Sequence, residues 1–181
     1  MNKKDILMAR KIFLPFTRLS YKKTTMQDIA NATGMSRQSI YKKFGSKEKC
    51  YNWAIQTYLS DMYSRIFEEL SRDQHGPFQT LQEVFEIFIG EGIDIINHSY
   101  GTNVLDDVLA ATYSSEEDWH VRFTNRLADF LVKNDCVTPE KSLGIAMALI
   151  SSGKGLLLVE TSKEQFKFDM TLIIKSVIDF K

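Results

Sequence analysis

The first stretch of the chain repeats apolar positions with the period of an α-helix. Lys and Arg fill the positions between them, and the apolar face carries Ile6, Ala9, Ile12, Phe13 and Phe16. This spacing predicts an amphipathic helix. Pro15 lies inside the pattern, and because proline has no backbone N–H we expect it to kink the helix or end it one turn early.

Two short helices with defined start and stop signals follow. Thr25 is placed to cap the first, and Asp28 lies in its first turn, where the helix dipole favours a negative charge. Gly34 predicts the end of this helix, since glycine adopts the left-handed conformation without steric cost. Ser36 then caps a second helix. Two helices separated by so short a turn predict a helix-turn-helix.

The second of these helices is predicted to have two different faces. At 100° per residue, Ile40 and Phe44 point inward. The outward face carries Gln38, Ser39 and Lys42, flanked by Arg37 and Tyr41. Such a basic, hydrogen-bonding face fits the major groove of DNA, where base edges present donors and acceptors. The alternative, a hairpin that only packs in a core, would bury polar groups without partners.

The remainder of the chain has helical periodicity throughout, so we expect an all-α fold. A third start at Ser46 opens a long helix to about residue 72, and Lys47 near its N-terminus is placed to clamp a DNA phosphate. Gly76-Pro77 ends this helix. Further helices are predicted at 78–98, 103–113, 115–134, 138–160 and 163–180, with Pro139 at a first helical position.

Charge divides the chain into two parts. Residues 1–50 hold twelve Lys and Arg against three acids, a net +9, and residues 51–181 carry a net −9. This asymmetry indicates a basic head that meets a polyanion and an acidic body that does not, although a basic surface without a partner is the simpler alternative. We expect a basic head at 1–47 and a helical body at 48–181.

Four blocks occur in order in the head: residues 24–30 (TTMQDIA), 34–36 (GMS), 39–44 (SIYKKF) and 46–48 (SKE). Together they resemble the DNA-binding domain of the tetracycline-repressor (TetR) family of bacterial transcription regulators, over about residues 6–55. The resemblance implies phosphate contacts by Thr25, Ser36, Tyr41 and Lys47. It implies positions near base edges for Arg37, Gln38, Ser39 and Lys43.

The resemblance also implies a three-helix DNA-binding domain at 1–47, a helical ligand-binding and dimerisation domain at 48–181, and the partners and activity of the protein. It implies a double-stranded DNA operator with an inverted repeat, a homodimer formed by the last two helices, and a small-molecule ligand that releases the regulator, most often a repressor. Small residues at 151–153 and 155 would let the dimer helices approach closely. The family very often has glycine where this chain has Gln38, so the operator sequence cannot be transferred from relatives.

Candidates for the ligand cavity are apolar or aromatic residues of the body: Phe85, Phe88, Tyr113, Trp119, Phe123 and Met147. Most such residues form plain core, and the periodicity does not separate the two roles. Gly90 and Gly92 interrupt a helical stretch and mark either room for a ligand or a helix crossing.

Other functions have weak support. The three histidines lack metal-ligand spacing on a shared helix, and no nucleophile motif or phosphate loop appears, so we expect no metal, no cofactor and no enzymatic activity. Cys50 and Cys136 fit a reducing cytoplasm, and the longest apolar run is too short for a membrane span. The competing hypothesis is an interaction protein of the same fold that binds an acidic protein instead of DNA.

Overall fold

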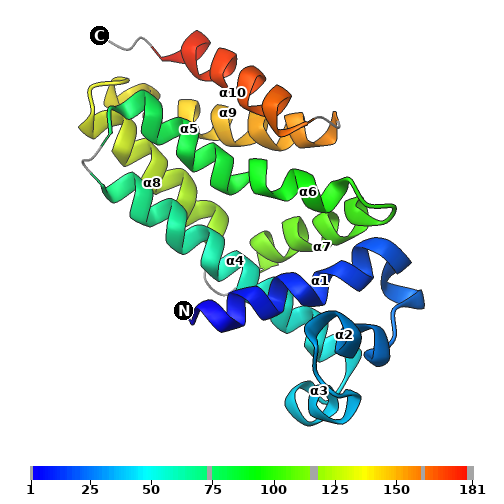
Figure 1. The fold of residues 1–181 in the computed structure, drawn as a ribbon. Helices are drawn as coiled ribbons and strands as arrows, with labels where there is room; N and C mark the ends of the chain where they lie inside the picture. The colour runs from blue at the N-terminus through cyan, green and yellow to red at the C-terminus, as the bar shows by residue number, and fades with distance from the viewer. Residues whose placement is uncertain (1, 73–74, 115–117, 160–161, 179–181) are drawn as a thin grey trace. The chain divides into compact units, whose positions relative to one another are not determined.

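The computed structural model describes residues 2–72, 75–114, 118–159 and 162–178. Every regular element within these ranges is helical, which confirms the predicted all-α class (Figure 1). The chain forms two units, one of Met1–Asp61 with Asp94–Ser114 and one of Met62–Ile93 with Ser115–Lys181.

The first unit packs the N-terminal helices against a later one. It contains α1 (Lys3–Lys23), α2 (Met26–Thr33), α3 (Arg37–Phe44), the first part of α4 (Lys47–Ser71) and α7 (Gly101–Ser114). The N–H of Tyr100 donates to the carbonyl of Thr17 at 2.8 Å, which ties the start of α7 to α1. This division by packing does not follow the boundary predicted after residue 47. The assignment of separate functions to 1–47 and 48–181 therefore stays a prediction.

The first helix does not end at Pro15, contrary to one of the two expected outcomes. α1 continues helically to Ser20, which has φ 69° and ψ 163°, and then resumes to Lys23. The break is closed by Thr24, whose hydroxyl donates to the carbonyls of Ser20 at 2.7 Å and Pro15 at 3.1 Å. The interruption thus lies five residues after the proline, at Ser20, where no residue type in the sequence predicts a break.

Replacing Ser20 with glycine should stabilise the protein. The backbone conformation of Ser20 is populated almost only by glycine, and its strain costs about 1–3 kcal/mol. Because glycine adds about 0.5–1 kcal/mol of unfolded-state entropy, we expect Ser20→Gly to raise the free energy of unfolding by about 1 kcal/mol. Urea denaturation would measure it. The matched control, Ser64→Gly in the exposed interior of α4, should instead lose about 0.5 kcal/mol; a loss for both would contradict the assigned strain.

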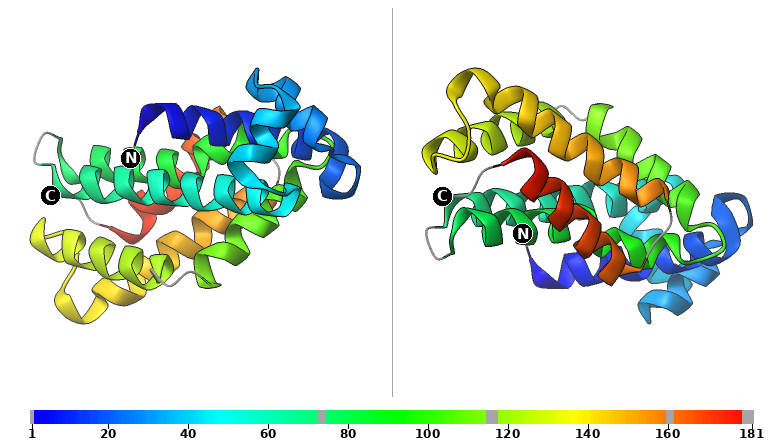
Figure 2. Two further views of the ribbon diagram at one scale, coloured as in Figure 1. Left: turned by 90° about the horizontal axis from the view of Figure 1, so that it is seen from below. Right: turned by 90° about the horizontal axis from the view of Figure 1, so that it is seen from above.

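The second unit holds the remaining helices. They are the end of α4, α5 (Pro77–Phe88), the 3₁₀ turn η1 (Gly90–Gly92), α8 (Trp119–Lys133), α9 (Pro139–Leu158) and α10 (Lys163–Val177). α8 and α9 lie side by side as a hairpin, and α10 packs on α5 and α9 (Figures 1 and 2). Pro139 occupies the first turn of α9, as predicted.

The single helix predicted over 78–98 is wrong. α5 ends at Phe88, η1 follows, and the short α6 (Ile93–Ile96) comes after it. Gly90 and Gly92 lower helix propensity at this point, and Gly90 lies against the carboxylate of Glu86, where a larger residue would collide with it. The predicted start of α8 at residues 115–117 lies outside the described residues.

α9 is apolar on two sides. Ala146, Leu149 and Leu157 are buried, and Gly153 brings α9 close to α5, since a Cβ there would lie 3.3 Å from the Phe85 ring. Gly153, expected at a dimer contact, therefore serves packing within the chain. By length and composition α9 is the one described helix that qualifies as a membrane span, a test that core helices of soluble proteins also pass; 33% of that stretch is buried.

Both cysteines are buried, one in each unit. Cys50 in α4 is fully inaccessible, and burial raises the pKa of its thiol to about 12. Cys136, between α8 and α9, donates weakly to the carbonyl of Asn134. Burial, aided by the charge of Asp135, also raises the pKa of the Cys136 thiol.

Candidate nucleic-acid interface

Side-chain caps fix the ends of α2 and α3. The hydroxyl of Thr25 accepts the N–H of Asp28 at 3.2 Å, and the Asp28 carboxylate accepts the N–H of Thr25 at 2.8 Å. The Thr25 hydroxyl also donates to the Asp28 carboxylate at 2.6 Å, and this bond, followed by that of the Thr25 N–H, lowers the pKa of Asp28. Gly34 ends α2 in the left-handed conformation at φ 73°, and Ser36 accepts the N–H of Ser39 at 3.1 Å to start α3. The predicted start and stop signals are confirmed.

α3 presents one apolar and one polar face. Ile40 is fully buried and Phe44 nearly so, which confirms the predicted inward face. Gln38, Ser39 and Lys42 are exposed, as their positions on the opposite side predicted. The apolar face fixes α3 on the rest of the unit, and the polar face is left open to a ligand as large as a DNA duplex.

Two cation–aromatic contacts hold basic side chains at the rim of this face. The guanidinium of Arg37 lies 5.6 Å from the centre of the Tyr41 ring. The ammonium of Lys43 lies 5.5 Å from the Phe44 ring and 5.6 Å from the ring of Trp53. Contacts of this kind restrain long side chains before any partner arrives, at a gain of about 0.5–1 kcal/mol each at exposed sites.

The residues predicted to bind phosphates differ in how many hydrogen bonds their side chains already make within the chain. Tyr41 is 42% exposed, and the hydroxyls of Thr25 and Ser36 act as helix caps on exposed residues. The ammonium of Lys47 donates to the carbonyls of Tyr21 at 2.7 Å and Thr24 at 3.0 Å. Two of its three donors are thus used to close the end of α1, which sequence reasoning did not anticipate.

Comparison with known sequences identifies this arrangement. Residues 16–52, which span the capping box, both helices of the motif and the start of α4, match the sequence model described as bacterial regulatory proteins of the TetR family. This segment has the sequence pattern of the TetR family, and α2 and α3 are the two helices of its helix-turn-helix.

One curated relative matches part of the chain. It is the uncharacterized HTH-type transcriptional regulator YezE of Bacillus subtilis (strain 168), 27% identical over 81 residues. The match covers 45% of this chain and 39% of the relative, so it spans well under half of that protein.

Solved structures share the fold over nearly the whole chain. A TetR transcriptional regulator from Legionella pneumophila superposes with a TM-score of 0.72 at 18% identity, covering 99% of this chain and 98% of that one. One from Haloarcula marismortui ATCC 43049 gives 0.68 at 11% identity, covering 99% and 100%. The ketosteroid transcriptional regulator KstR2 of Mycobacterium tuberculosis gives 0.64 at 16% identity, covering 99% and 97%.

Four of the six predicted ligand residues meet in the second unit. Trp119 stacks on Tyr63 with ring centres 5.0 Å apart, and the rings of Phe88 and Phe123 lie 4.9 Å apart at 64°. Phe85 adjoins Phe88 at 6.3 Å. We call these five residues the aromatic cluster. Phe85 and Phe123 are fully buried within it, whereas Trp119 is partly exposed.

The other two predicted ligand residues do not join the aromatic cluster. Tyr113 is 60% exposed and belongs to the first unit, and Met147 is 51% exposed on α9. An open recess of about 590 Å³ in the first unit is lined by none of the six predicted residues. Its wall includes Tyr51, whose hydroxyl donates to the carboxylate of Asp107 at 2.8 Å.

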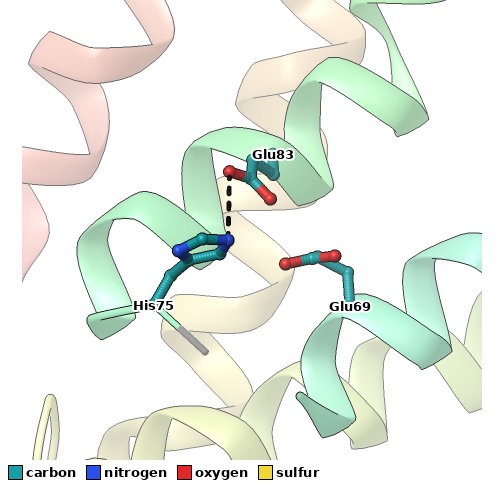
Figure 3. A group of neighbouring side chains, drawn as sticks. All are labelled: Glu69, His75 and Glu83. Atoms are coloured by element: carbon teal, nitrogen blue, oxygen red, sulfur yellow. Dashed lines mark ion pairs between the residues drawn. The ribbon is translucent and has the colours of Figure 1, made fainter. Parts of the chain in front are cut away.

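A second polar cluster joins the end of α4 to α5, and the sequence did not predict it. Glu69, His75 and Glu83 each offer one atom suited to a metal ion, and these atoms lie within 4.8 Å of one another (Figure 3). His75 Nε2 is 3.9 Å from a carboxylate oxygen of Glu83. Spacing along one helix gave no signal for this cluster, because its members come from two helices and the connection between them.

Proposed function

We propose that this protein is a homodimeric, sequence-specific repressor of the cytoplasm that binds an inverted-repeat operator and is released by a small molecule. The exposed polar face of α3 on a head of net charge +9 carries this proposal. The N-terminal residues of a recognition helix contact base edges in the major groove, and Arg37, Gln38 and Ser39 hold those positions in α3. Lys42 and Lys43 extend the basic face by one turn.

Phosphate contacts supply most of the affinity and none of the sequence information in this proposal. Thr25, Ser36, Tyr41 and Lys47 take this role, by resemblance to the family, around the edges of the two helices. Lys47 offers its remaining donor and its charge, while its bonds to Tyr21 and Thr24 keep the α1–α2 connection in place. We therefore expect Lys47 to act on both stability and binding, which makes Tyr41 the cleaner position for a test.

The exposed apolar stripe of α9 supports the homodimer. Leu143, Met147 and Leu158 fall within about 60° of one another on the helix and are 49%, 51% and 71% exposed. Phe168 and Leu172, one turn apart on α10, are 59% and 49% exposed. A second copy would bury these side chains, and two recognition helices about 34–36 Å apart would then read successive major-groove turns.

The aromatic cluster supports a ligand of apolar or aromatic character in the second unit. Phe85, Phe88 and Phe123 form its buried part, and the partly exposed Trp119 is the place where a ligand would enter. A ligand that prefers the state with unfavourably spaced heads weakens operator binding by its own differential affinity and by no more. Tyr113 and Met147 are exposed and lie outside the aromatic cluster, so the cluster gives no support to ligand contacts by these two residues.

Selection from a randomised duplex pool at two salt concentrations tests the DNA-binding proposal. We expect an inverted repeat that is bound at least about a thousandfold more tightly than random sequence. Enrichment of no sequence at either salt concentration would contradict the proposal and favour the interaction protein, in which the basic head binds an acidic partner.

Substitution of Gln38 with alanine should relax base preference at one position of each half-site. A side chain that reads a base edge contributes about 1–3 kcal/mol of discrimination, so operator affinity should fall by that amount while affinity for random DNA is unchanged. Tyr41→Phe is the matched control and should weaken both equally, because a phosphate contact carries no sequence information. Equal losses on operator and random DNA for Gln38→Ala would remove its base-reading role.

A further inference from the structure

One carboxylate oxygen at the junction of α4 and α5 lacks the partner that its burial requires. Glu69 is only 5% exposed, and its Oε1 has no hydrogen-bond partner among the described residues. The other oxygen accepts from the Arg72 guanidinium at 3.2 Å. A buried charged acceptor left unpaired costs more than the about 1–3 kcal/mol of a neutral one. The structure therefore leaves a buried oxygen with capacity for a cation.

The charges around this oxygen also call for a cation. Glu83 faces Glu69, and Glu68 adds a third carboxylate that already shares Arg72 with Glu69. The cationic side chains beside these carboxylates are Arg72, which Glu68 and Glu69 share, and His75, which is charged only when protonated. Two carboxylates held together around one imidazole are therefore under-neutralised by the side chains that surround them.

We propose that Glu69, His75 and Glu83 form a binding site for a divalent transition-metal ion such as Zn²⁺. Imidazole nitrogen favours Zn²⁺ and its neighbours in the first transition row, whereas Ca²⁺ requires six to eight oxygen ligands and Mg²⁺ near-ideal octahedral oxygens. Three protein ligands with an open fourth position are a common coordination for Zn²⁺. The site goes beyond the proposed DNA-binding function and does not depend on it.

The side chains around the three ligands have the arrangement of an outer shell. Gln79 donates to an oxygen of Glu83 at 3.0 Å, and Arg72 holds one oxygen of Glu69. Arg72 thus orients Glu69 and leaves its other oxygen for the ion, whereas Gln79 orients Glu83 through the same oxygen that lies nearest His75. His75 and Glu83 are both partly exposed, and Glu83 borders an open recess of about 530 Å³ along α5, which gives an ion access from solvent.

Binding requires the three ligand atoms, which lie within 4.8 Å of one another, to draw closer together. Ligand atoms about 2.1 Å from a tetrahedral Zn²⁺ lie about 3.4 Å from one another. The 3.9 Å between His75 Nε2 and the Glu83 oxygen needs a shift of a fraction of an ångström, which the exposed His75 can supply by side-chain rotation. The buried Glu69 faces the other two side chains of the cluster (Figure 3).

Titration of the chelator-treated full-length protein with Zn²⁺ and Co²⁺, followed by calorimetry and Co²⁺ absorption, tests this site. We expect one ion per chain and a Co²⁺ spectrum of nitrogen and oxygen ligands without thiolate charge transfer. Glu69→Gln, His75→Gln and Glu83→Gln should each weaken binding by at least about a hundredfold, because loss of an outer-shell partner alone costs about 10–100-fold. Glu83→Gln changes a partly exposed side chain, so folding does not obscure its result.

Controls separate this site from adventitious binding. Glu86→Gln, one turn from Glu83 on α5 and outside the cluster, should leave the affinity unchanged, as should His98→Gln. Absence of saturable binding, equal binding by the wild type and the three ligand variants, or a thiolate spectrum from Cys50 or Cys136 would each overturn the proposal. The titration contains no DNA, so its failure is distinct from a failure of operator binding.

Discussion

Met147→Glu is expected to convert the homodimer to a monomer and to lower operator affinity by about 10²–10⁴-fold, the advantage that linkage of two binding modules provides. Met147 lies in the middle of the exposed apolar stripe of α9, between Leu143 and Leu158. In the isolated chain the new carboxylate is solvated, so the fold of the second unit should be unaffected. In the dimer two such carboxylates would be buried without partners, at a cost of several kcal/mol.

Sedimentation at micromolar concentration and operator titration measure the two effects together. Val121→Glu is the matched control, because Val121 is an apolar residue that is 52% exposed on α8, away from the stripe. The control should remain dimeric and bind the operator normally. A Met147→Glu protein that stays dimeric would place the interface elsewhere, and a monomeric wild type would remove the dimer from the proposed function.

Phe123→Ala should lower the free energy of unfolding by about 3–5 kcal/mol, much of the about 5–15 kcal/mol that a native protein has in total. The Phe123 ring is fully buried and packs against Phe88 at 4.9 Å and Tyr63 at 6.0 Å. Its removal takes away apolar burial and leaves a cavity that neighbouring rings fill only in part. The same substitution should also abolish response to a ligand of the aromatic cluster.

Thermal and urea unfolding in the absence of ligand measure this loss. Tyr113→Ala is the control from the same set of predicted ligand residues, and its 60% exposure predicts a change within about 0.5 kcal/mol. Near-equal effects of the two substitutions would contradict the packing described for Phe123. A ligand effect that survives Phe123→Ala would move the binding site away from the aromatic cluster.

The helix-turn-helix was predictable because local chemistry fixes each of its boundaries. Thr25, Gly34 and Ser36 act through their own backbone geometry and nearest hydrogen bonds, so their roles do not depend on the rest of the fold. The division of α3 into a buried and an exposed face followed from helical period alone. Which exposed side chains contact bases and which contact phosphates remains a prediction, because no DNA partner defines the contacts.

Features that depend on packing between distant segments were harder to predict from the sequence. Pro15 suggested an early end to the first helix, yet the break lies at Ser20, where hydrogen bonds from Thr24 compensate for the strained backbone. Apolar spacing continued across Gly90 and Gly92, so periodicity predicted one helix where there are three short elements. Only the low helix propensity of the two glycines indicated that the helix would be interrupted there.

The body shows why residue type alone does not define a site. Aromatic and apolar character selected Phe123 and Met147 equally, but one is fully buried and the other is half exposed. Conversely, the sequence around Glu69 and Glu83 has no pattern that marks a metal site. His75 has no second ligand at helical spacing, so its position gave no signal either. These three lie together from the end of α4, from residue 75 and from α5, and that geometry is not encoded in any one local motif.

The buried thiols allow the rate of local opening to be measured separately in each unit. A thiol reacts as its thiolate, and burial both shields Cys50 and Cys136 and disfavours ionisation, so neither should be modified while its surroundings are closed. The rate at which a thiol reagent consumes each cysteine then reports the frequency with which that part of the chain opens. One cysteine lies in α4 of the first unit and the other beside α8 and α9 of the second. Mass spectrometry that locates the modified cysteine would therefore give a separate opening rate for each unit from one unlabelled sample.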